Sequence, residues 1–287
     1  MSLCASCTKF SVNAPVRSSE KKTPEWLHEV NYVQEFINKK NFANRKPAGS
    51  DQVIKLSMGK NNKNRKVLYW AAKKSSSLLV TDAKSAYDKF QNHGITQLDD
   101  KGNTTIHIQS PRIYKTVAKG KKKPESYYSH FHVVVSNKEI NEWESNNIYT
   151  QVVVCKRDLK YVQQCLKSSS AIVLNALPCE FYGHDHIPNS YNLTAKQVKK
   201  FSARELGEWL FSLCDLHYPN ISKNLHAGKI LINEVPIICY CANSRCTASA
   251  QLEMELLHKG CLRVESFPGG MKEYRQSAWI WHIKFGV

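Results

Sequence analysis

The pattern of hydrophobic positions changes near residue 150. Before that point, short apolar runs alternate with polar, turn-rich segments; the runs span residues 53–56, 67–71, 78–81, 104–109 and 131–135. Short runs bounded by turn residues are typical of β-strands. Residues 23–150 are therefore expected to form a mostly-β domain, interpreted as a β-sandwich.

After residue 150, strand-like runs alternate with helical patterns. Expected strands cover residues 151–155, 171–174, 236–240 and 264–267, and expected helices cover 160–166 and 203–214. This alternation predicts a parallel sheet with helices on both faces. Residues 151–287 are therefore expected to form an α/β domain whose functional site lies beyond the carboxyl ends of its strands.

Two shorter helices are expected in the first half of the chain. Residues 1–22 are polar and are predicted to form a flexible tail. Thr23 and Pro24 then fit the N-cap and first position of a helix, which continues to about Ile37. A second short helix is predicted over residues 83–92, with Asp82 as its N-cap.

Charge is concentrated in the first half. The net charge is +17; residues 1–150 contain 25 Lys and Arg against 13 Asp and Glu, whereas the remainder contains 16 against 11. This excess predicts nucleic acid or another acidic partner for the N-terminal domain, and the basic segment 119–124 is a candidate for phosphate contacts. The alternative is that these lysines only keep the protein soluble.

Neither a signal peptide nor a membrane span is predicted. The first ten residues lack a sufficient apolar run, and no segment approaches the ~18 apolar residues of a span. We therefore expect a cytoplasmic protein with no membrane partner. The ten cysteines lack regular spacing, which favours reduced thiols. Cys4 and Cys7 have the spacing of a zinc-binding pair but no second pair nearby.

Cys241 is the leading candidate for a reactive thiol. It follows the apolar run 237–240 and precedes a short loop and a helix, which is indicated by the spacing of Ala248, Leu252 and Leu256 and ends near His258. A cysteine that faces the N–H groups of a helix N-terminus has a lowered pKa, because the thiolate is stabilised there. The alternative is that Cys239 and Cys241 are small apolar residues at a strand end.

His130 and His132 form a second candidate site. Residues i and i+2 of a strand project to one face roughly 7 Å apart, so both imidazoles could reach one metal ion. The alternative is an ordinary, partly exposed histidine pair.

Residues 102–114, the pair at 130–132 and the segment 67–71 together resemble intradiol ring-cleavage dioxygenases. Those enzymes are β-sandwiches that hold ferric iron with two tyrosines and a His-x-His pair. The resemblance implies an iron or zinc site formed by His130, His132 and Tyr114. The family has its other tyrosine ligand a few residues after the position of Trp70, and no tyrosine occurs there in this chain. Tyr87 lies too far along the chain to match that ligand. We therefore expect a relative that has lost ring-cleaving chemistry.

Three segments of the C-terminal half, 185–190, 240–247 and 267–274, resemble the signatures of the rhodanese-like family in their family order. The resemblance covers residues 150–287 and requires no cofactor. It implies that Cys241 takes up sulfane sulfur as a persulfide and that loop amides hold the anion. The implied catalytic residues are Cys241, Arg245 and Cys246, and the implied substrate-binding residues are Ala242, Asn243, Ser244 and Thr247. The implied partners are a sulfur donor or acceptor, or a thiol protein.

Several positions depart from the rhodanese-like pattern. Asn175 and Leu177 occupy the positions of the family's Asp and Arg, and Cys246 occupies that of the loop arginine. Without a closing arginine, phosphatase activity is disfavoured. Cys246 could instead resolve a persulfide on Cys241 as a disulfide; the alternative is that Cys246 is a buried small residue. Three functional hypotheses follow. The first is sulfurtransferase or thiol–disulfide chemistry through Cys241, the second is a catalytically degenerate structural or binding protein, and the third is a nucleic-acid role for the basic N-terminal domain.

In the order of its two domains and in its Lys- and Asn-rich composition, the chain resembles proteins of large nucleocytoplasmic DNA viruses. This resemblance implies a virion location as the alternative to the cytoplasm.

Overall fold

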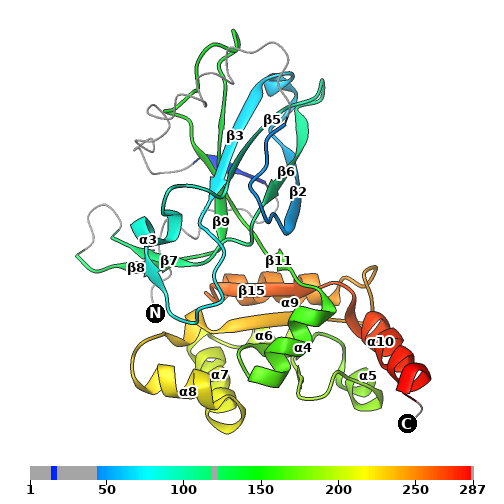
Figure 1. Cartoon of the computed structure of the whole chain (residues 1–287). Coiled ribbons are helices and arrows are strands. Elements are labelled where there is room, and N and C mark those ends of the chain that lie inside the picture. The colour runs from blue at the N-terminus through cyan, green and yellow to red at the C-terminus, as the bar shows by residue number, and fades with distance from the viewer. Residues whose placement is uncertain (1–13, 18–43, 118–121, 286–287) are drawn as a thin grey trace. The chain divides into compact units, whose positions relative to one another are not determined.

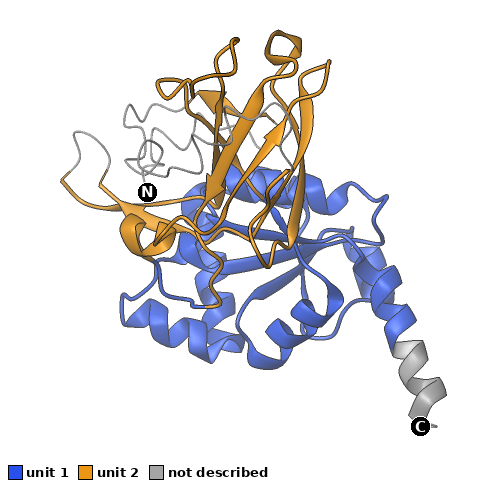
Figure 2. Cartoon of the chain, turned by 45° about the horizontal axis from the view of Figure 1, so that its top comes forward, with its two compact units in different colours: residues 1–3, 77–80, 154–287 blue, residues 4–76, 81–153 orange. Residues whose placement is uncertain are grey.

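The computed structural model describes residues 14–17, 44–117 and 122–285, with side chains to residue 277 (Figure 1). The chain divides into two compact units (Figure 2). Unit 1 contains residues 1–3, 77–80 and 154–287, and unit 2 contains residues 4–76 and 81–153.

Unit 1 is built on a five-stranded parallel sheet. Its strands, in spatial order, are β11 (Cys155–Lys156), β15 (Arg263–Phe267), β14 (Pro236–Tyr240), β12 (Ile172–Asn175) and β13 (Tyr191–Asn192). Every neighbouring pair is parallel. The mixed α/β character with a parallel sheet, expected from the alternating pattern, is confirmed.

Helices cover both faces of this sheet (Figure 1). Successive residues of a strand point to opposite faces, so Ile238 and Tyr240 share a face. They form one buried core with Val162 of α4 (Leu159–Ser168) and Met271 of α10 (Gly270–Phe285). On the other face, α9 (Ala248–His258) lies against β14 and β15, and α6 (Ala195–Lys200) packs against α9. The remaining helices of unit 1 are α5 (Cys179–His184), α7 (Ala203–His217), α8 (Pro219–His226) and η3 (Ile232–Glu234).

Polar side chains define where these helices begin. Asp158 accepts a hydrogen bond from the Tyr161 N–H at the start of α4. Ser202 and Glu205 form a reciprocal capping box at the start of α7. Such caps satisfy N–H groups that have no partner within the helix and contribute about 1 kcal/mol each.

Unit 2 consists of antiparallel and mixed sheets. The largest contains β1 (Val16–Arg17), β10 (Tyr149–Val152), β9 (His130–Val135), β3 (Lys66–Ala71) and β5 (His93–Gln97), in that order. A two-stranded sheet pairs β2 (Gln52–Ser57) with β6 (Asn103–Ile108). A third contains β4 (Thr81–Asp82), β7 (Tyr114–Thr116) and β8 (Glu125–Tyr127), and the short helices are η2 (Lys60–Asn62) and α3 (Ala83–Tyr87). The sandwich arrangement stays a prediction.

The expected strands at 53–56, 67–71, 104–109 and 131–135 correspond to β2, β3, β6 and β9, with small shifts at their ends. Three other expectations differ from the structure. Only the end of the run 78–81 is a strand. The expected helix 83–92 stops at Tyr87, because Asp88 has a positive φ of 49° that ends it. The expected strand 151–155 is divided between β10 of unit 2 and β11 of unit 1.

Part of the expected N-terminal tail is ordered, because Val16 and Arg17 pair with β10. The helix predicted after Thr23, the Cys4–Cys7 pair and most of the basic segment 119–124 lie outside the described residues. None of the described helices combines the length and apolar character that crossing a membrane requires.

Candidate functional site

The loop that begins at Cys241 connects β14 to α9 at the carboxyl edge of the parallel sheet. Asn243 shapes this loop twice. Its carbonyl accepts a hydrogen bond from the Cys246 N–H at 3.0 Å, and its side-chain oxygen accepts one from the Arg245 N–H at 2.9 Å. The loop is therefore a closed turn that brings Cys241 and Cys246 to its two ends.

The turn after β15 holds the loop from the other side. The N–H groups of Met271 and Lys272 donate to the carbonyl oxygens of Cys241 and Ala242, at 3.0 and 2.9 Å. Gly270 permits this approach, because a Cβ there would lie 2.2 Å from the Cys241 oxygen. Its φ of 56° also lies in the region that glycine tolerates best. The double glycine of the sequence thus positions the cysteine loop.

Cys241 is buried beneath this loop, with an exposed fraction of 2%. Its Sγ lies 3.4 Å from the Cys246 carbonyl oxygen, 3.7 Å from the Asn243 carbonyl oxygen and 3.4 Å from Ser249 Oγ. Burial raises the pKa of the Cys241 thiol; the hydroxyl and N–H of Ser249 lower it only in part, and the Cys246 side chain raises it further. The expectation of a lowered Cys241 pKa is therefore wrong.

Cys246 has the opposite electrostatic environment. Its side chain is half-buried. Burial raises the pKa of this thiol, but hydrogen bonds from the Ala248 N–H, the Cys241 thiol and the Ala242 N–H outweigh burial, and the pKa is lowered. Loop amides that were expected to stabilise Cys241 or a bound anion therefore face the sulfur of Cys246. The side chains of Ser244, Arg245 and Thr247 are exposed, and Thr247 makes no side-chain cap to α9.

A cavity of about 620 Å³ lies beside the loop, where Ala242 and Asn243 form part of its wall. Its other walls come from α5, the end of β12 and α10, and include Leu177, Phe181, Asp185, Met271, Lys272 and Arg275. Arg275 Nε pairs with Asp185 Oδ2 at 2.5 Å. Sequence reasoning missed Lys272 and Arg275 as site residues, although Lys272 falls inside the segment 267–274 that was singled out.

Hydrogen bonds between uncharged groups fix the ends of β12 and β14. The Tyr240 hydroxyl is hydrogen-bonded to Ser190 Oγ at 2.7 Å and accepts from the Ile187 N–H at 3.0 Å. The fully buried Asn175 accepts from the Leu177 N–H at 2.8 Å. The rhodanese-like pattern has an Asp and an Arg at these two positions. Asn175 and Leu177 replace that charged pair with one neutral hydrogen bond.

In unit 2, His130 and His132 both meet tyrosines. Tyr114 on β7 lies with its hydroxyl 3.1 Å from His130 Nε2. The hydroxyl of Tyr87, the last residue of α3, lies 3.0 Å from His132 Nε2 and 3.4 Å from His130 Nε2, and donates to the Tyr114 hydroxyl at 3.2 Å. The structure therefore brings the three expected residues together and adds Tyr87, which its distance in sequence from Trp70 had excluded.

Burial keeps the two histidines of this cluster neutral. The four side chains are each 9% exposed or less. Burial lowers the pKa of His130 to about 4, and burial together with the nearby His130 lowers the pKa of His132. The outer nitrogens are also engaged: His130 Nδ1 lies 2.5 Å from the Tyr128 carbonyl oxygen, and His132 Nδ1 lies 2.9 Å from Thr150 Oγ1. These contacts orient both Nε2 atoms toward the tyrosines.

Two neutral imidazoles and two phenols form a donor set suited to a metal ion, because phenol oxygens bind metal once deprotonated. Within the described part of the chain, no group of three or more His, Cys, Asp and Glu side chains could hold a metal ion. The cluster reaches four donors only through its tyrosines.

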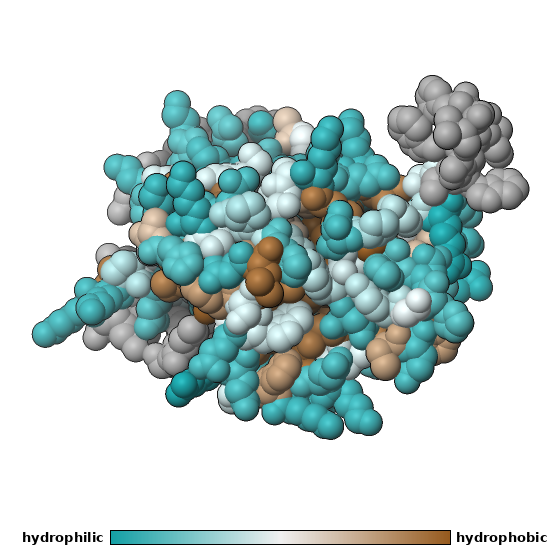
Figure 3. Space-filling view, turned by 90° about the horizontal axis from the view of Figure 1, so that it is seen from below, coloured by the Kyte–Doolittle hydropathy of each residue, from teal (hydrophilic) through white to brown (hydrophobic). Residues whose placement is uncertain are grey.

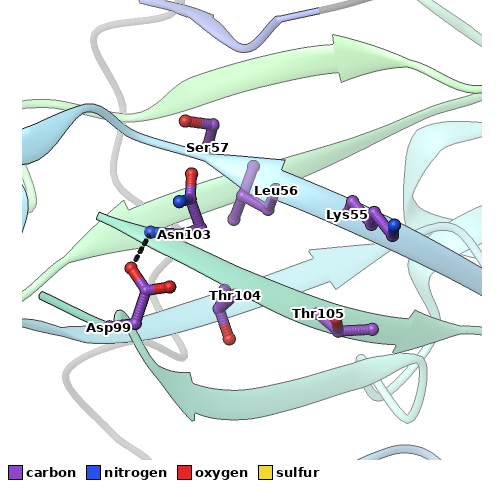
Figure 4. A pocket seen from close by; sticks show the side chains of 7 residues that line it. All are labelled: Lys55, Leu56, Ser57, Asp99, Asn103, Thr104 and Thr105. Atoms are coloured by element: carbon purple, nitrogen blue, oxygen red, sulfur yellow. Dashed lines mark hydrogen bonds between the residues drawn. The ribbon is translucent and has the colours of Figure 1, made fainter. Parts of the chain in front are cut away.

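A second cavity, of about 360 Å³, lies in unit 2 beside β2 and β6 (Figure 4). The one carboxylate in its wall, Asp99, accepts hydrogen bonds from the N–H groups of Lys101 and Asn103 at 2.9 and 2.8 Å. These contacts hold the turn before β6 and lower the pKa of Asp99, chiefly through Asn103. The carboxylate thus has a structural role.

No family model matches the chain, and no curated protein matches it. Solved structures similar to part of the chain include single-domain sulfurtransferases. The Saccharomyces cerevisiae protein RDL2 is 9% identical over 44% of this chain and 91% of its own, with a TM-score of 0.31. The human protein TSTD1 is 12% identical over 43% of this chain and 97% of its own, with a TM-score of 0.31. The BH2092 protein of Bacillus halodurans is 19% identical over 43% and 73%, with a TM-score of 0.30.

These comparisons give no support to the resemblances to ring-cleavage dioxygenases and to viral proteins.

The face of the molecule in Figure 3 is largely hydrophilic, and its apolar side chains are scattered rather than joined into one patch.

Proposed function

We propose that unit 1 carries out thiol–disulfide or sulfane-sulfur chemistry with the pair Cys241 and Cys246. The observation that carries this proposal is the geometry of the loop, which has a free thiol at each end and brings the Cys241 sulfur to 3.4 Å from the Cys246 carbonyl oxygen. Burial and the loop amides give the two thiols different pKa values, so that one ionises before the other.

The chemistry needs no cofactor. A thiolate of the pair attacks a sulfur of a disulfide or persulfide, or the outer sulfur of thiosulfate. It forms a new S–S bond and expels a thiolate, hydrosulfide or sulfite. The second thiol loses its proton and attacks the sulfur of the first, which closes the Cys241–Cys246 disulfide and releases the bound thiol, or hydrosulfide where the first step left a persulfide. The substrate is reduced by two electrons, and the pair is oxidised by two.

The proposal is tested by exposing the purified full-length protein to glutathione disulfide or to thiosulfate, followed by peptide mapping with mass spectrometry. We expect an internal Cys241–Cys246 disulfide from glutathione disulfide, or a persulfide on the pair from thiosulfate. Cys241→Ser and Cys246→Ser should each abolish the internal disulfide. Cys179 is exposed on α5, so Cys179→Ser serves as the matched control and should behave as the unsubstituted protein. The proposal fails if Cys179 reacts while the pair stays reduced.

A second candidate function, the binding of iron or zinc in unit 2, is favoured by one specific observation. Tyr87, Tyr114, His130 and His132 meet with donor atoms 3.0 to 3.4 Å apart. When bound, such an ion supplies Lewis-acid chemistry. The two imidazoles already turn their Nε2 atoms toward the tyrosine hydroxyls, and two phenolates would balance the charge of the ion.

Elemental analysis of the purified protein, before and after incubation with ferric iron or zinc, tests this candidate. We expect about one ion per chain and a substantial loss of binding in Tyr87→Phe and Tyr114→Phe. Tyr127→Phe is the matched control, since Tyr127 stacks on Tyr114 with 5.9 Å between ring centroids and phenylalanine keeps that ring. Equal binding in all of these variants would remove the candidate.

A further inference from the structure

The two cysteines of the loop differ in their access to a substrate. Cys241 is almost completely enclosed, and two carbonyl oxygens lie within 3.7 Å of its sulfur. Partial negative charges that close to a sulfur oppose its ionisation. Cys246 is half-exposed, at the end of the loop that adjoins α9.

The hydrogen-bond donors of the loop favour the same residue. Hydrogen bonds from the Ala248 N–H, the Cys241 thiol and the Ala242 N–H lower the pKa of Cys246 against the effect of burial. Ala248 is the first residue of α9, so its N–H is one of those left without a partner in the helix. Backbone donors and the helix dipole stabilise a thiolate at this place.

We propose that Cys246, and not Cys241, is the sulfur that attacks the substrate, and that Cys241 is the resolving thiol beneath it. This inference rests on the proposed thiol chemistry of the loop. It reverses the roles that the rhodanese-like pattern implies, because Cys246 has taken the place of the arginine and uses the amides available for an anion.

The reaction then proceeds in two balanced steps. The Cys246 thiolate attacks one sulfur of a disulfide R–S–S–R, forms Cys246–S–S–R and releases RS⁻, which takes a proton from water. Cys241 loses its proton to water, attacks Sγ of Cys246 and releases the second RS⁻. The products are two RSH, after protonation, and the Cys241–Cys246 disulfide.

The first step prepares the second. The Cys246 side chain raises the pKa of Cys241 as long as it is a free thiol or thiolate. A mixed disulfide at Cys246 carries no negative charge on that sulfur, so this effect on Cys241 is removed. The hydroxyl and N–H of Ser249 still stabilise a Cys241 thiolate. Cys241 therefore becomes easier to ionise only after substrate has reacted, which orders the two steps.

Trapping of the mixed disulfide tests the assignment. With glutathione disulfide at pH 7, Cys241→Ser should accumulate glutathione on Cys246. In Cys246→Ser, the reaction at Cys241 should be at least ~10-fold slower, because that thiol is enclosed and less ionised. Cys179→Ser is again the control. Equal or faster trapping at Cys241 would overturn the inference while leaving the proposed function in place. A protein in which neither cysteine of the pair reacts would overturn the proposed function itself.

A second measurement needs no substitution. Brief alkylation of the unsubstituted protein with iodoacetamide at pH 7, followed by peptide quantification, should label Cys246 before Cys241 by ~10-fold or more. Preferential labelling of Cys241 would contradict the assignment even if the serine variants failed to fold.

Discussion

The Cys241–Cys246 loop of unit 1 and the Tyr–His cluster of unit 2 respond differently to burial. In the loop, burial is uneven: it encloses Cys241, whereas Cys246 stays half-exposed among backbone donors. In the cluster, burial acts alike on all four side chains and holds both histidines neutral. The loop therefore gives two identical groups different exposures and different pKa values, and the cluster assembles different groups into one closed set.

The same contrast extends to the pH dependence of the two units. Unit 1 contains Glu253 on α9, 7% exposed, whose pKa burial raises to about 7, against the lowering effects of Ser266 and Lys156. A buried carboxyl of this kind favours the folded state at low pH. The buried histidines of unit 2 favour it at high pH. The two units are therefore expected to lose stability in opposite directions of pH.

The largest expected effect is that of His132→Ala on unit 2. The substitution removes the hydrogen bonds of His132 to the Tyr87 hydroxyl and to Thr150 Oγ1, and it opens a cavity beside Trp70, whose ring stacks on His132 with 5.3 Å between centroids. Together these losses should cost about 4 kcal/mol. Urea-dependent hydrogen exchange in β3 and β9 peptides measures the effect in unit 2 alone. A loss below about 1 kcal/mol would show that the cluster does not stabilise the unit.

Much of the unit 1 fold could be predicted because each signal was local. The apolar run before Cys241, the four-residue spacing of α9 and the double glycine at 269–270 each determine one element and its neighbour. The loop was found for the same reason. Its electrostatics were not predicted, because the identity of the thiol that the amides face depends on where the backbone turns at Asn243.

Unit 2 was harder to predict because its pairings are distant in sequence. Tyr87 and His132 meet across 45 residues, and Asp88 ends the helix that carries Tyr87. The number of residues between Trp70 and Tyr87 could not show that the chain turns back and brings Tyr87 to the histidines. The expected strand 151–155 was wrong for another reason. This apolar run contributes to β10 in one sheet and to β11 in another, and hydrophobic periodicity does not indicate where a chain passes from one sheet to the next.

A smaller effect is expected on acidification of unit 2. The pKa of His130 is about 4 in the folded protein and about 6.5 in the unfolded chain, so the unfolded chain binds the proton first as the pH falls. Stability is complete above pH 6.5 and should fall by about 3 kcal/mol by pH 4. Hydrogen exchange of β9 peptides between pH 7 and pH 4, corrected for the intrinsic rates, measures this loss. A constant stability across the range would mean that His130 is not held neutral.

The last of the three effects, about as large as that of His130 and opposite in sign, is expected for Glu253→Gln in unit 1. The Glu253 pKa of about 7 exceeds its unfolded value of about 4.5, so the folded protein keeps the proton longer. Stability from the protonated form is complete below pH 4.5 and is lost as the pH rises through 7. Glutamine removes this loss, and the substitution should stabilise unit 1 by about 3 kcal/mol at pH 8 while changing little at pH 4.5. Exchange in β14 and α9 peptides measures the change, with unit 2 peptides as the internal control. Destabilisation at pH 8 would mean that the Glu253 carboxylate is ionised and paired in the folded state, and the two units would then share the same direction of pH dependence.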